Sequence, residues 1–196
     1  MNIEKWRHYC RARVFELFKQ PERALEDYRA ALSCDPAFVK AVLCIAYLHA
    51  MRHQYADAER GYLEALRIRP RDADSWFNLG YVRDKMREHA GAIDAFREAV
   101  RLNPMLDRAW YGMGLAHAAL GEHRQAMEVL ERAAKMQPMG SPVWYQYGMA
   151  CHHAHEPEKL RAVIKHLNRF DPKSARRLIV DTGTSDLAYL VKDLVV

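Results

Sequence analysis

The densest group of side chains that could bind a metal ion consists of Cys151, His152, His153 and His155. Cys151 and His155 are four residues apart and would share one face of a helix. Zinc requires three or four ligands that converge on one point, whereas adjacent residues of a helix point in different directions. The sequence therefore predicts no metal site here, and no other pattern in it predicts a cofactor.

Motifs that support catalysis are absent from the sequence. None of the patterns HExxH, GxxxxGK(S/T) and GxSxG occurs in it. The nearest approach to a glycine-rich phosphate loop is Gly112-Met113-Gly114, which lacks the third glycine and lies inside an expected helix. We therefore expect a protein that is not an enzyme.

The sequence contains an internal repeat of 34 residues, and the helices of this repeat determine where the side chains named above are placed. Five of the 8 prolines follow one another at this interval, at Pro36, Pro70, Pro104, Pro138 and Pro172. A fixed period of this kind indicates a repeat architecture. The expected repeats span residues 5–38, 39–72, 73–106, 107–140 and 141–174.

Each repeat is expected to form two amphipathic helices. In the third repeat, Trp76 and Gly80 stand at helical spacing, and so do Ala92 and Phe96. The small residues allow the two backbones to approach closely. The proline near the end of each repeat is expected to end the second helix, because it lacks an N–H group. One helical hairpin cannot bury its apolar face alone, so the repeats are expected to stack into a solenoid.

The third repeat resembles the tetratricopeptide repeat (TPR), whose pattern is W-x2-L-G-x2-Y, A-x3-F, A and P. The matching residues are Trp76, Leu79, Gly80, Ala92, Phe96, Ala99 and Pro104. Arg83 departs from the pattern, since the family prefers Tyr at this position. The resemblance extends over five repeats, 170 of the 196 residues. It implies an all-α fold, a right-handed α-solenoid of TPR helix-turn-helix repeats over residues 1–174.

Residues 175–196 are expected to form a C-terminal capping segment. Another first helix starts after Pro172, but we expect it to break at Thr182-Gly183-Thr184. Apolar residues then recur at the spacing i, i+3, i+4, i+7 and i+8, at Leu187, Leu190, Val191, Leu194 and Val195. This stripe predicts an amphipathic helix that begins near Thr184 or Ser185 and seals the last repeat. Docking of a partner on this helix is the alternative.

For function, the resemblance implies binding of another protein. In the TPR family the first helices of successive repeats line a concave groove. The second, fifth, ninth, twelfth and thirteenth positions of each repeat face a bound peptide or helix there. The candidate groove residues carried over are Tyr9, Arg13, Lys40, Tyr47, Asp74, Phe77, Tyr81, Asp84, Lys85, Arg108, Tyr111, Tyr145 and Met149. Burial of the rings would supply affinity, and the charges would set the register of the partner.

The aromatic residues at the fifth position also have an architectural interpretation, because Tyr is common there in TPRs of any function. Specificity is therefore expected from the ninth, twelfth and thirteenth positions. The carboxylate clamp of heat-shock cochaperones is not expected. Asn78 is the only Asn at a sixth position, and the other clamp positions hold Leu43, Tyr47, Arg108 and Gly112 in place of Lys, Asn, Lys and Arg.

The charge of the chain raises nucleic acid as another partner. The chain carries Lys+Arg 30 against Asp+Glu 25, a net charge of +5, and its pI is near 9.0. The excess is spread over three repeats, whereas a nucleic-acid site concentrates Lys and Arg on one face. We therefore expect a protein partner and no nucleic acid. An RNA-binding accessory protein, a self-assembling TPR scaffold that forms homo-oligomers, and a secretion-type chaperone are the alternatives.

The composition bears on the location of the protein. At 50% hydrophobic residues, the chain is too apolar to be disordered. No run approaches the roughly eighteen apolar residues of a membrane span, and the first residues lack the apolar region of a secretory signal. The four cysteines show no CxxC spacing, which suits a reducing compartment. We expect a cytoplasmic protein without membrane insertion.

Overall fold

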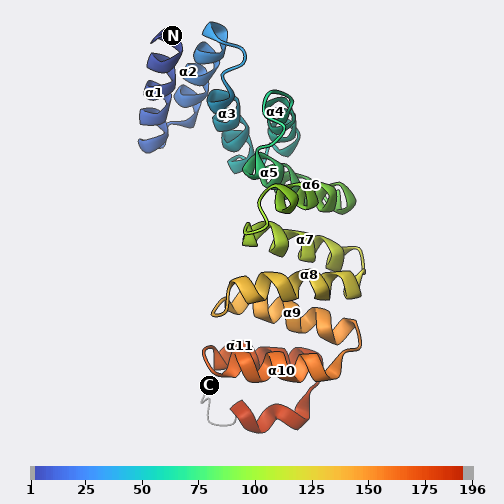
Figure 1. The fold of residues 1–196 in the computed structure, drawn as a ribbon. Helices are drawn as coiled ribbons and strands as arrows, with labels where there is room; N and C mark the ends of the chain where they lie inside the picture. The colour runs from blue at the N-terminus through green and yellow to red at the C-terminus, as the bar shows by residue number, and fades with distance from the viewer. Residues whose placement is uncertain (1–2, 192–196) are drawn as a thin grey trace. The chain divides into compact units, whose positions relative to one another are not determined.

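A computed structural model describes residues 3–191 of the chain. Every regular element within this range is a helix, as the sequence predicted. The helices belong to two compact units, divided between Leu102 and Asn103 (Figure 1). None of the helices in residues 3–191 is long and apolar enough to cross a membrane.

In the first unit, the described residues stack as helix pairs. Each pair has a first helix and a second helix: α1 packs on α2, α3 on α4, and α5 on α6. The first helices α3 and α5 also pack on the second helix that precedes them, α2 and α4 respectively. The bounds are α1 (Ile3–Leu17), α2 (Pro21–Cys34), α3 (Val39–Met51), α4 (Tyr55–Ile68), α5 (Ala73–Lys85) and α6 (His89–Leu102).

The second unit follows the same pattern. Its helix pairs are α7 with α8 and α9 with α10, and α9 also packs on the preceding α8. A further helix, α11, packs on α9 and α10 and is followed by a short 3-10 helix, η1. The bounds are α7 (Asp107–Ala119), α8 (His123–Met136), α9 (Ser141–His153), α10 (Pro157–Asn168), α11 (Pro172–Thr182) and η1 (Ser185–Val191).

The core lies between the helices and follows the repeat. Each second helix buries a large apolar side chain at the twenty-fourth repeat position, which is Tyr28, Tyr62, Phe96, Leu130 or Ile164. Each of these side chains is at most 2% exposed. The recurring pattern of large residues in the sequence is therefore a pattern of buried second-helix side chains.

Glycine at the eighth repeat position allows the two helices of a pair to approach closely. A Cβ atom added at Gly80 would lie 2.7 Å from Cδ1 of Phe96, and one added at Gly114 would lie 2.5 Å from Cγ of Leu130. Real Cβ atoms essentially never approach other carbons this closely. The close packing predicted from small residues therefore requires glycine at these two sites.

The periodic prolines lie just outside the second helices of four pairs. Each of α2, α4, α6 and α8 ends two residues before its proline, which is Pro36, Pro70, Pro104 or Pro138. Pro172 differs, because it stands in the first turn of α11, where its missing N–H removes no helical hydrogen bond.

The turn inside each helix pair contains a residue in the left-handed region. The φ angle is 56° at Lys19, 59° at His53, 64° at Arg87, 75° at Gly121 and 58° at His155. These residues share one repeat position, because they follow one another at intervals of 34. Four of the five carry a side chain, so four turns hold a backbone conformation that L-residues adopt only at a cost.

The end of the described chain contains the predicted break and a helix after it. Helix α11 ends at Thr182, and Gly183 follows with φ 68°, so the predicted break is confirmed. The next residues, Ser185–Val191, form the predicted helix from Ser185, and its geometry over this range is that of a 3-10 helix. The segment starts with a tight turn in which the N–H of Leu187 donates to the carbonyl of Thr184 at 3.2 Å.

The helix η1 covers the last helices of the second unit. Leu187 and Val191 are buried in the core cluster that contains residues of α10 and α11, and Leu190 packs against the same cluster partly buried. The other two residues of the predicted stripe, Leu194 and Val195, lie outside the described residues.

Candidate functional site

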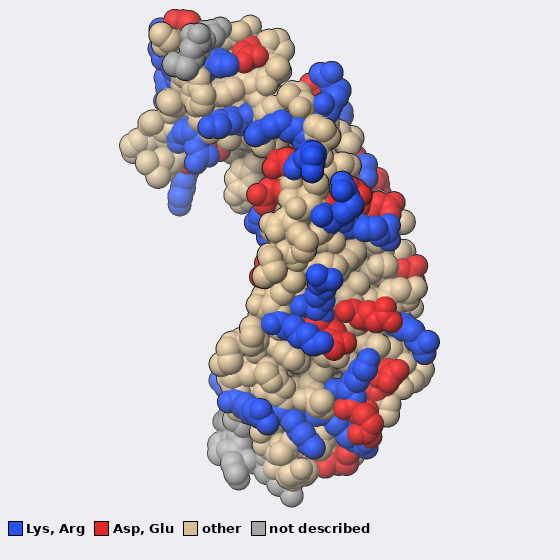
Figure 2. Space-filling view, in the orientation of Figure 1, with Lys and Arg blue, Asp and Glu red and all other residues tan. Residues whose placement is uncertain are grey.

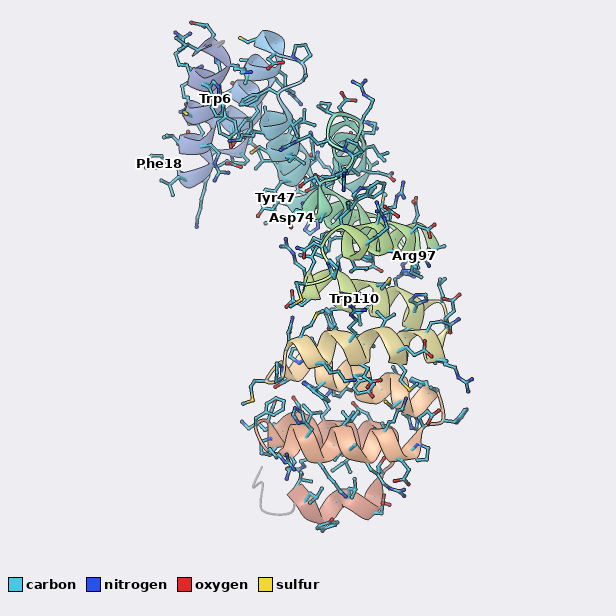
Figure 3. The ribbon with its side chains drawn as sticks, in the orientation of Figure 1. Trp6, Phe18, Tyr47, Asp74, Arg97 and Trp110 are labelled. Carbon is cyan, nitrogen blue, oxygen red and sulfur yellow. The ribbon has the colours of Figure 1, made fainter. Side chains whose placement is uncertain are left out.

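Three first helices of the first unit enclose a pocket of about 210 Å³, which we call the N-terminal groove. It brings together three of the expected residues: Arg13 from α1, Tyr47 from α3 and Asp74 from α5. Figure 3 labels Tyr47 and Asp74 on their two helices. The full lining is Arg13, Leu43, Cys44, Tyr47, Tyr62, Asp72, Asp74, Ser75 and Asn78.

Two tyrosines give this region its exposed aromatic surface. Tyr47 is 52% exposed, and Tyr81, one helical turn beyond Asn78 on α5, is 44% exposed. The Nζ atom of Lys85 lies 5.3 Å from the centroid of the Tyr81 ring, a cation–π distance. Neither residue lines the pocket itself, so Tyr81 and Lys85 form a surface beside the N-terminal groove in which an aromatic ring and a cation are both available.

Arg13 is held in place by its neighbours on α1 and α2. Its Nη1 atom lies 2.6 Å from Oε2 of Glu16, and the hydroxyl of Tyr28 donates to the same oxygen at 2.7 Å. Glu16 raises the pKa of Arg13, and burial raises the pKa of Tyr28. The guanidinium thus stays charged and oriented, while the exposed carboxylate of Asp74 supplies the opposite charge on another wall.

Two other charged candidates have partners within the protein. The Nζ atom of Lys40 lies 4.9 Å from the centroid of the Trp6 ring, which comes from α1. Oδ1 of Asp84 lies 3.0 Å from Nδ1 of His89 at the start of α6. Both residues are on first helices, as expected, but neither lines the N-terminal groove.

The fifth-position aromatics of the first unit pack inside it. Tyr9 contacts Trp6 and Phe38 edge-on, with ring centroids 5.7 and 5.4 Å apart, and burial raises its pKa. Phe77 lies 5.9 Å from Phe96 between ring centroids. These contacts favour the architectural interpretation for Tyr9 and Phe77.

The second unit has its own pocket between first helices, of about 360 Å³, which we call the C-terminal groove. Tyr145 and Met149 of α9 line it, as expected. The hydroxyl of Tyr145 donates to Asp181 of α11, and the guanidinium of Arg177 lies 4.9 Å from the centroid of its ring. Tyr145 is therefore oriented by two residues of α11. The full lining is Ala118, His123, Tyr145, Gln146, Met149, Ala150, His153 and Arg177.

The two remaining candidates do not line the C-terminal groove. Tyr111 packs partly buried against the core cluster of this unit, and burial raises its pKa. Arg108 is exposed in the first turn of α7. The structure therefore brings Tyr145 and Met149 together and leaves Tyr111 and Arg108 outside the pocket.

Sequence reasoning missed the sixth repeat position. Cys44 and Asn78 stand at this position and line the N-terminal groove, and Gln146 stands at it and lines the C-terminal groove. The sequence did offer a signal that the sixth position faces the groove, because the carboxylate clamp of heat-shock cochaperones uses the sixth position.

Histidines line a further cavity of the second unit, of about 760 Å³. His123 of α8 and His153 of α9 stack with ring centroids 4.8 Å apart, and Nδ1 of His123 has no hydrogen-bond partner among the described residues. Burial lowers the pKa of His153, and His123, His152 and His155 lower it further. Burial and the neighbouring imidazoles therefore favour the uncharged form of His153.

The cysteine that precedes His152 and His153 in the sequence does not have a reactive thiol. Cys151 is fully buried, and burial raises its pKa to about 11. Within residues 3–191, no group of three or more His, Cys, Asp and Glu side chains is arranged to hold a metal ion. The chemistry that the two grooves offer is recognition through rings, amides and charges.

Comparison with known proteins identifies the repeat. The family model described as "Tetratricopeptide repeat" matches residues 43–105, 81–141 and 111–159, which together span more than half of the chain. Proteins of this fold bind other proteins or act as scaffolds, and they are generally not enzymes. No curated protein sequence matches the chain.

Solved structures with this fold include three informative examples. The MamA protein has a TM-score of 0.78 at 19% identity, and the match covers 100% of this chain and 99% of MamA. YrrB, described as a TPR protein with an unusual peptide-binding site, has a TM-score of 0.77 at 21% identity and covers 90% of each chain. The pilF protein of Pseudomonas aeruginosa has a TM-score of 0.73 at 19% identity and covers 97% of this chain and 93% of its own.

Proposed function

Because the chain belongs to the tetratricopeptide-repeat family, we propose that it is a non-catalytic adaptor that captures a segment of a partner protein in the N-terminal groove. The observation that carries this proposal is the exposure of Tyr47 and Tyr81 beside a pocket between three first helices. Covering exposed apolar surface contributes about 25 cal/mol per Å². Two half-exposed rings therefore give a partner a source of affinity.

The charges around the groove support a partner segment that carries both acidic and basic groups. Arg13 is fixed by Glu16 on α1, and Asp74 lies on the facing helix α5. An acidic group of the partner would pair with Arg13, and a basic group would pair with Asp74. Lys85 beside Tyr81 adds a second cation at the end of the site. The order of charges along the partner would then select its register.

The C-terminal groove is a second surface of the same kind in the other unit. Tyr145 and Met149 supply an aromatic ring and a flexible thioether, and Gln146 supplies an amide. Arg177 beside the ring adds a cation. This combination supports contact with an extended segment. The ring and the thioether can pack on its apolar side chains, the amide can form hydrogen bonds with its backbone, and the cation can pair with an acidic side chain.

The proposal includes a reducing, cytoplasmic compartment. All four cysteines are free, and Cys10 is exposed. Exposed free thiols are typical of proteins that are kept in a reducing environment.

The proposal is tested by changing the exposed ring and cation together. Tyr81→Ala with Lys85→Ala should abolish capture of the partner from cell lysate, because the variant loses the ring and the charge that the partner covers. The matched control is Leu63→Ala, which removes an exposed side chain of α4 outside both grooves and should leave capture unchanged. Circular dichroism should show the same helix content in all three proteins. Undiminished capture by the double variant would contradict the groove assignment.

A further inference from the structure

The wall of the N-terminal groove contains a buried tyrosine whose hydroxyl has no hydrogen-bond partner. Tyr62 of α4 is 2% exposed and lines the groove. Its hydroxyl forms no hydrogen bond with another residue in the range 3–191. An unpaired polar group in a buried side chain lowers the stability of a protein, so native structures nearly always satisfy such groups. The hydroxyl of Tyr62 therefore marks a place where a bound segment can supply the missing partner.

The first repeat shows how the same hydroxyl is satisfied inside the protein. Tyr28 stands at the same twenty-fourth position, and its hydroxyl donates to Oε2 of Glu16 at 2.7 Å. Glu16 stands at the twelfth position of the first repeat, where the second repeat has Ala50. The methyl group of Ala50 forms no hydrogen bond. The second repeat therefore leaves Tyr62 without the partner that Tyr28 has.

A second polar side chain in the same pocket is also without a hydrogen bond. Asn78 of α5 lines the groove, and its side-chain amide forms no hydrogen bond with another described residue. Tyr62 and Asn78 come from α4 and α5, which pack on each other. The pocket that they share, of about 210 Å³, has room for a single long side chain of a partner.

The charges on the walls select the kind of side chain. Asp72, at the N-cap of α5, accepts a hydrogen bond from Ser75 but forms no ion pair with a residue in the range 3–191. Asp74 adds a second carboxylate to the lining, whereas the cation of Arg13 is already paired with Glu16. Figure 2 shows Asp and Glu side chains around the point at which Figure 3 labels Asp74. The pocket therefore favours a cation and disfavours an anion.

We propose that this pocket, which we call the basic subsite, binds a Lys or Arg side chain of the partner segment. The cationic group donates hydrogen bonds to the hydroxyl oxygen of Tyr62, the side-chain oxygen of Asn78 and the carboxylate of Asp72. The aliphatic part of the side chain lies against Leu43 and the ring of Tyr47, which line the same pocket. This inference rests on the function proposed for the N-terminal groove and identifies a side chain that the groove selects.

The probe is a library of short random peptides, displayed on phage and selected on the full chain. The selected peptides should share a Lys or Arg at one position. A synthetic peptide of the selected sequence is then compared with an analogue that has norleucine at this position, which keeps an aliphatic chain and lacks the charge. Fluorescence anisotropy with the full chain should show at least 10-fold tighter binding of the basic peptide.

Two variants of the subsite test the assigned contacts. Tyr62→Phe removes the hydroxyl and keeps the buried ring. The preference for the basic peptide over its norleucine analogue should then fall by about 5-fold, the effect of losing one hydrogen bond. Asp72→Asn should also reduce this preference, because it removes the charge and keeps a residue that is favourable at an N-cap.

The matched control is Tyr147→Phe, the same change at a buried tyrosine of the second unit that lines neither groove. This variant should leave the preference for the basic peptide unchanged. Circular dichroism should show the same helix content in the three variants and in the unsubstituted protein, so that a change in preference reports the subsite and not the fold.

Two results would overturn the basic subsite. The first is a selection whose peptides share no Lys or Arg, for example one that yields an acidic or an amide side chain instead. The second is a preference for the basic peptide that Tyr62→Phe and Asp72→Asn leave unchanged. In either case, loss of peptide binding in the variant Tyr81→Ala with Lys85→Ala would still support the function proposed for the groove. Peptides that bind this double variant normally would contradict that function instead, and a selection that yields no peptide would contradict both.

Discussion

Replacing Arg87 by glycine should stabilise the protein. Arg87 forms the turn between α5 and α6 with φ 64°, and its side chain is exposed. This conformation costs an L-residue roughly 1–2 kcal/mol, whereas glycine adopts it freely. Glycine loses about 0.5–1 kcal/mol more conformational free energy than other residues when the chain folds. The balance predicts that Arg87→Gly raises the free energy of unfolding by about 0.5–1 kcal/mol.

Two matched variants separate the backbone from the side chain. Arg87→Ala keeps an L-residue at the turn and removes the side chain, so it should leave the stability nearly unchanged. Gly121 has the same turn position in the second unit, with φ 75° and open space where a Cβ would be. Gly121→Ala should therefore lower the free energy of unfolding by about 1 kcal/mol, through backbone strain alone. Lys19→Gly repeats the stabilising test at φ 56°.

The assay is thermal unfolding followed by the helical circular dichroism signal. For a chain of this size, about 1 kcal/mol shifts the Tm by roughly 2–4 °C. Arg87→Gly should therefore raise the Tm by about 1–4 °C, and Gly121→Ala should lower it by about 2–4 °C. Equal shifts for Arg87→Gly and Arg87→Ala would refute the reasoning, because the left-handed backbone would then carry no strain.

Two further predictions concern the close helix contacts and the clustered histidines. Gly80→Ala should lower the free energy of unfolding by about 1–3 kcal/mol, measured by urea denaturation, because its Cβ would lie 2.7 Å from the ring of Phe96. The control Gly91→Ala meets only a flexible side chain at 3.3 Å and should not destabilise. Burial and three neighbouring histidines lower the pKa of His153 below 6.5, so the folded state binds fewer protons than the unfolded chain. Stability should therefore be full above about pH 6.5 and fall as the pH drops through the lowered pKa. His153→Gln should flatten that dependence between about pH 7.5 and pH 5 in urea titrations, and an unchanged slope would exclude His153 as its source.

The helices could be predicted well from the sequence because the same residue pattern recurs in each repeat. Ambiguity at one position, such as Arg83 in place of Tyr, is outweighed by agreement at the same position in neighbouring repeats. The turns are a different case. Only Gly121 marks the left-handed position, and Lys19, His53 and Arg87 give no local sign of it. Their backbone conformation is imposed by the packing of the helices on either side, which residue types alone do not reveal.

The candidate groove was predicted in part, for a similar reason. The repeat position of a residue fixes the helix face on which it lies, so Arg13, Tyr47 and Asp74 could be assigned to one surface. Whether a side chain on that face is available depends on its neighbours. Tyr9 and Phe77 occupy the right positions but pack on other rings. Such contacts cross between helices, and a repeat pattern does not determine them.

Helix α1 separates two surfaces by the geometry of the helix itself. Arg13 and Val14 are adjacent in sequence, but their side chains leave the helix about 100° apart. Arg13 lines the N-terminal groove, whereas Val14 lies half exposed on another side of α1. Substitutions at these two residues can therefore be combined to ask whether one partner uses both surfaces. If it does, binding at one surface raises the effective concentration of the partner at the other. Loss of either contact then weakens binding far more than the surface area buried in that contact accounts for. If two partners are involved, each substitution removes one partner and leaves the affinity for the other unchanged.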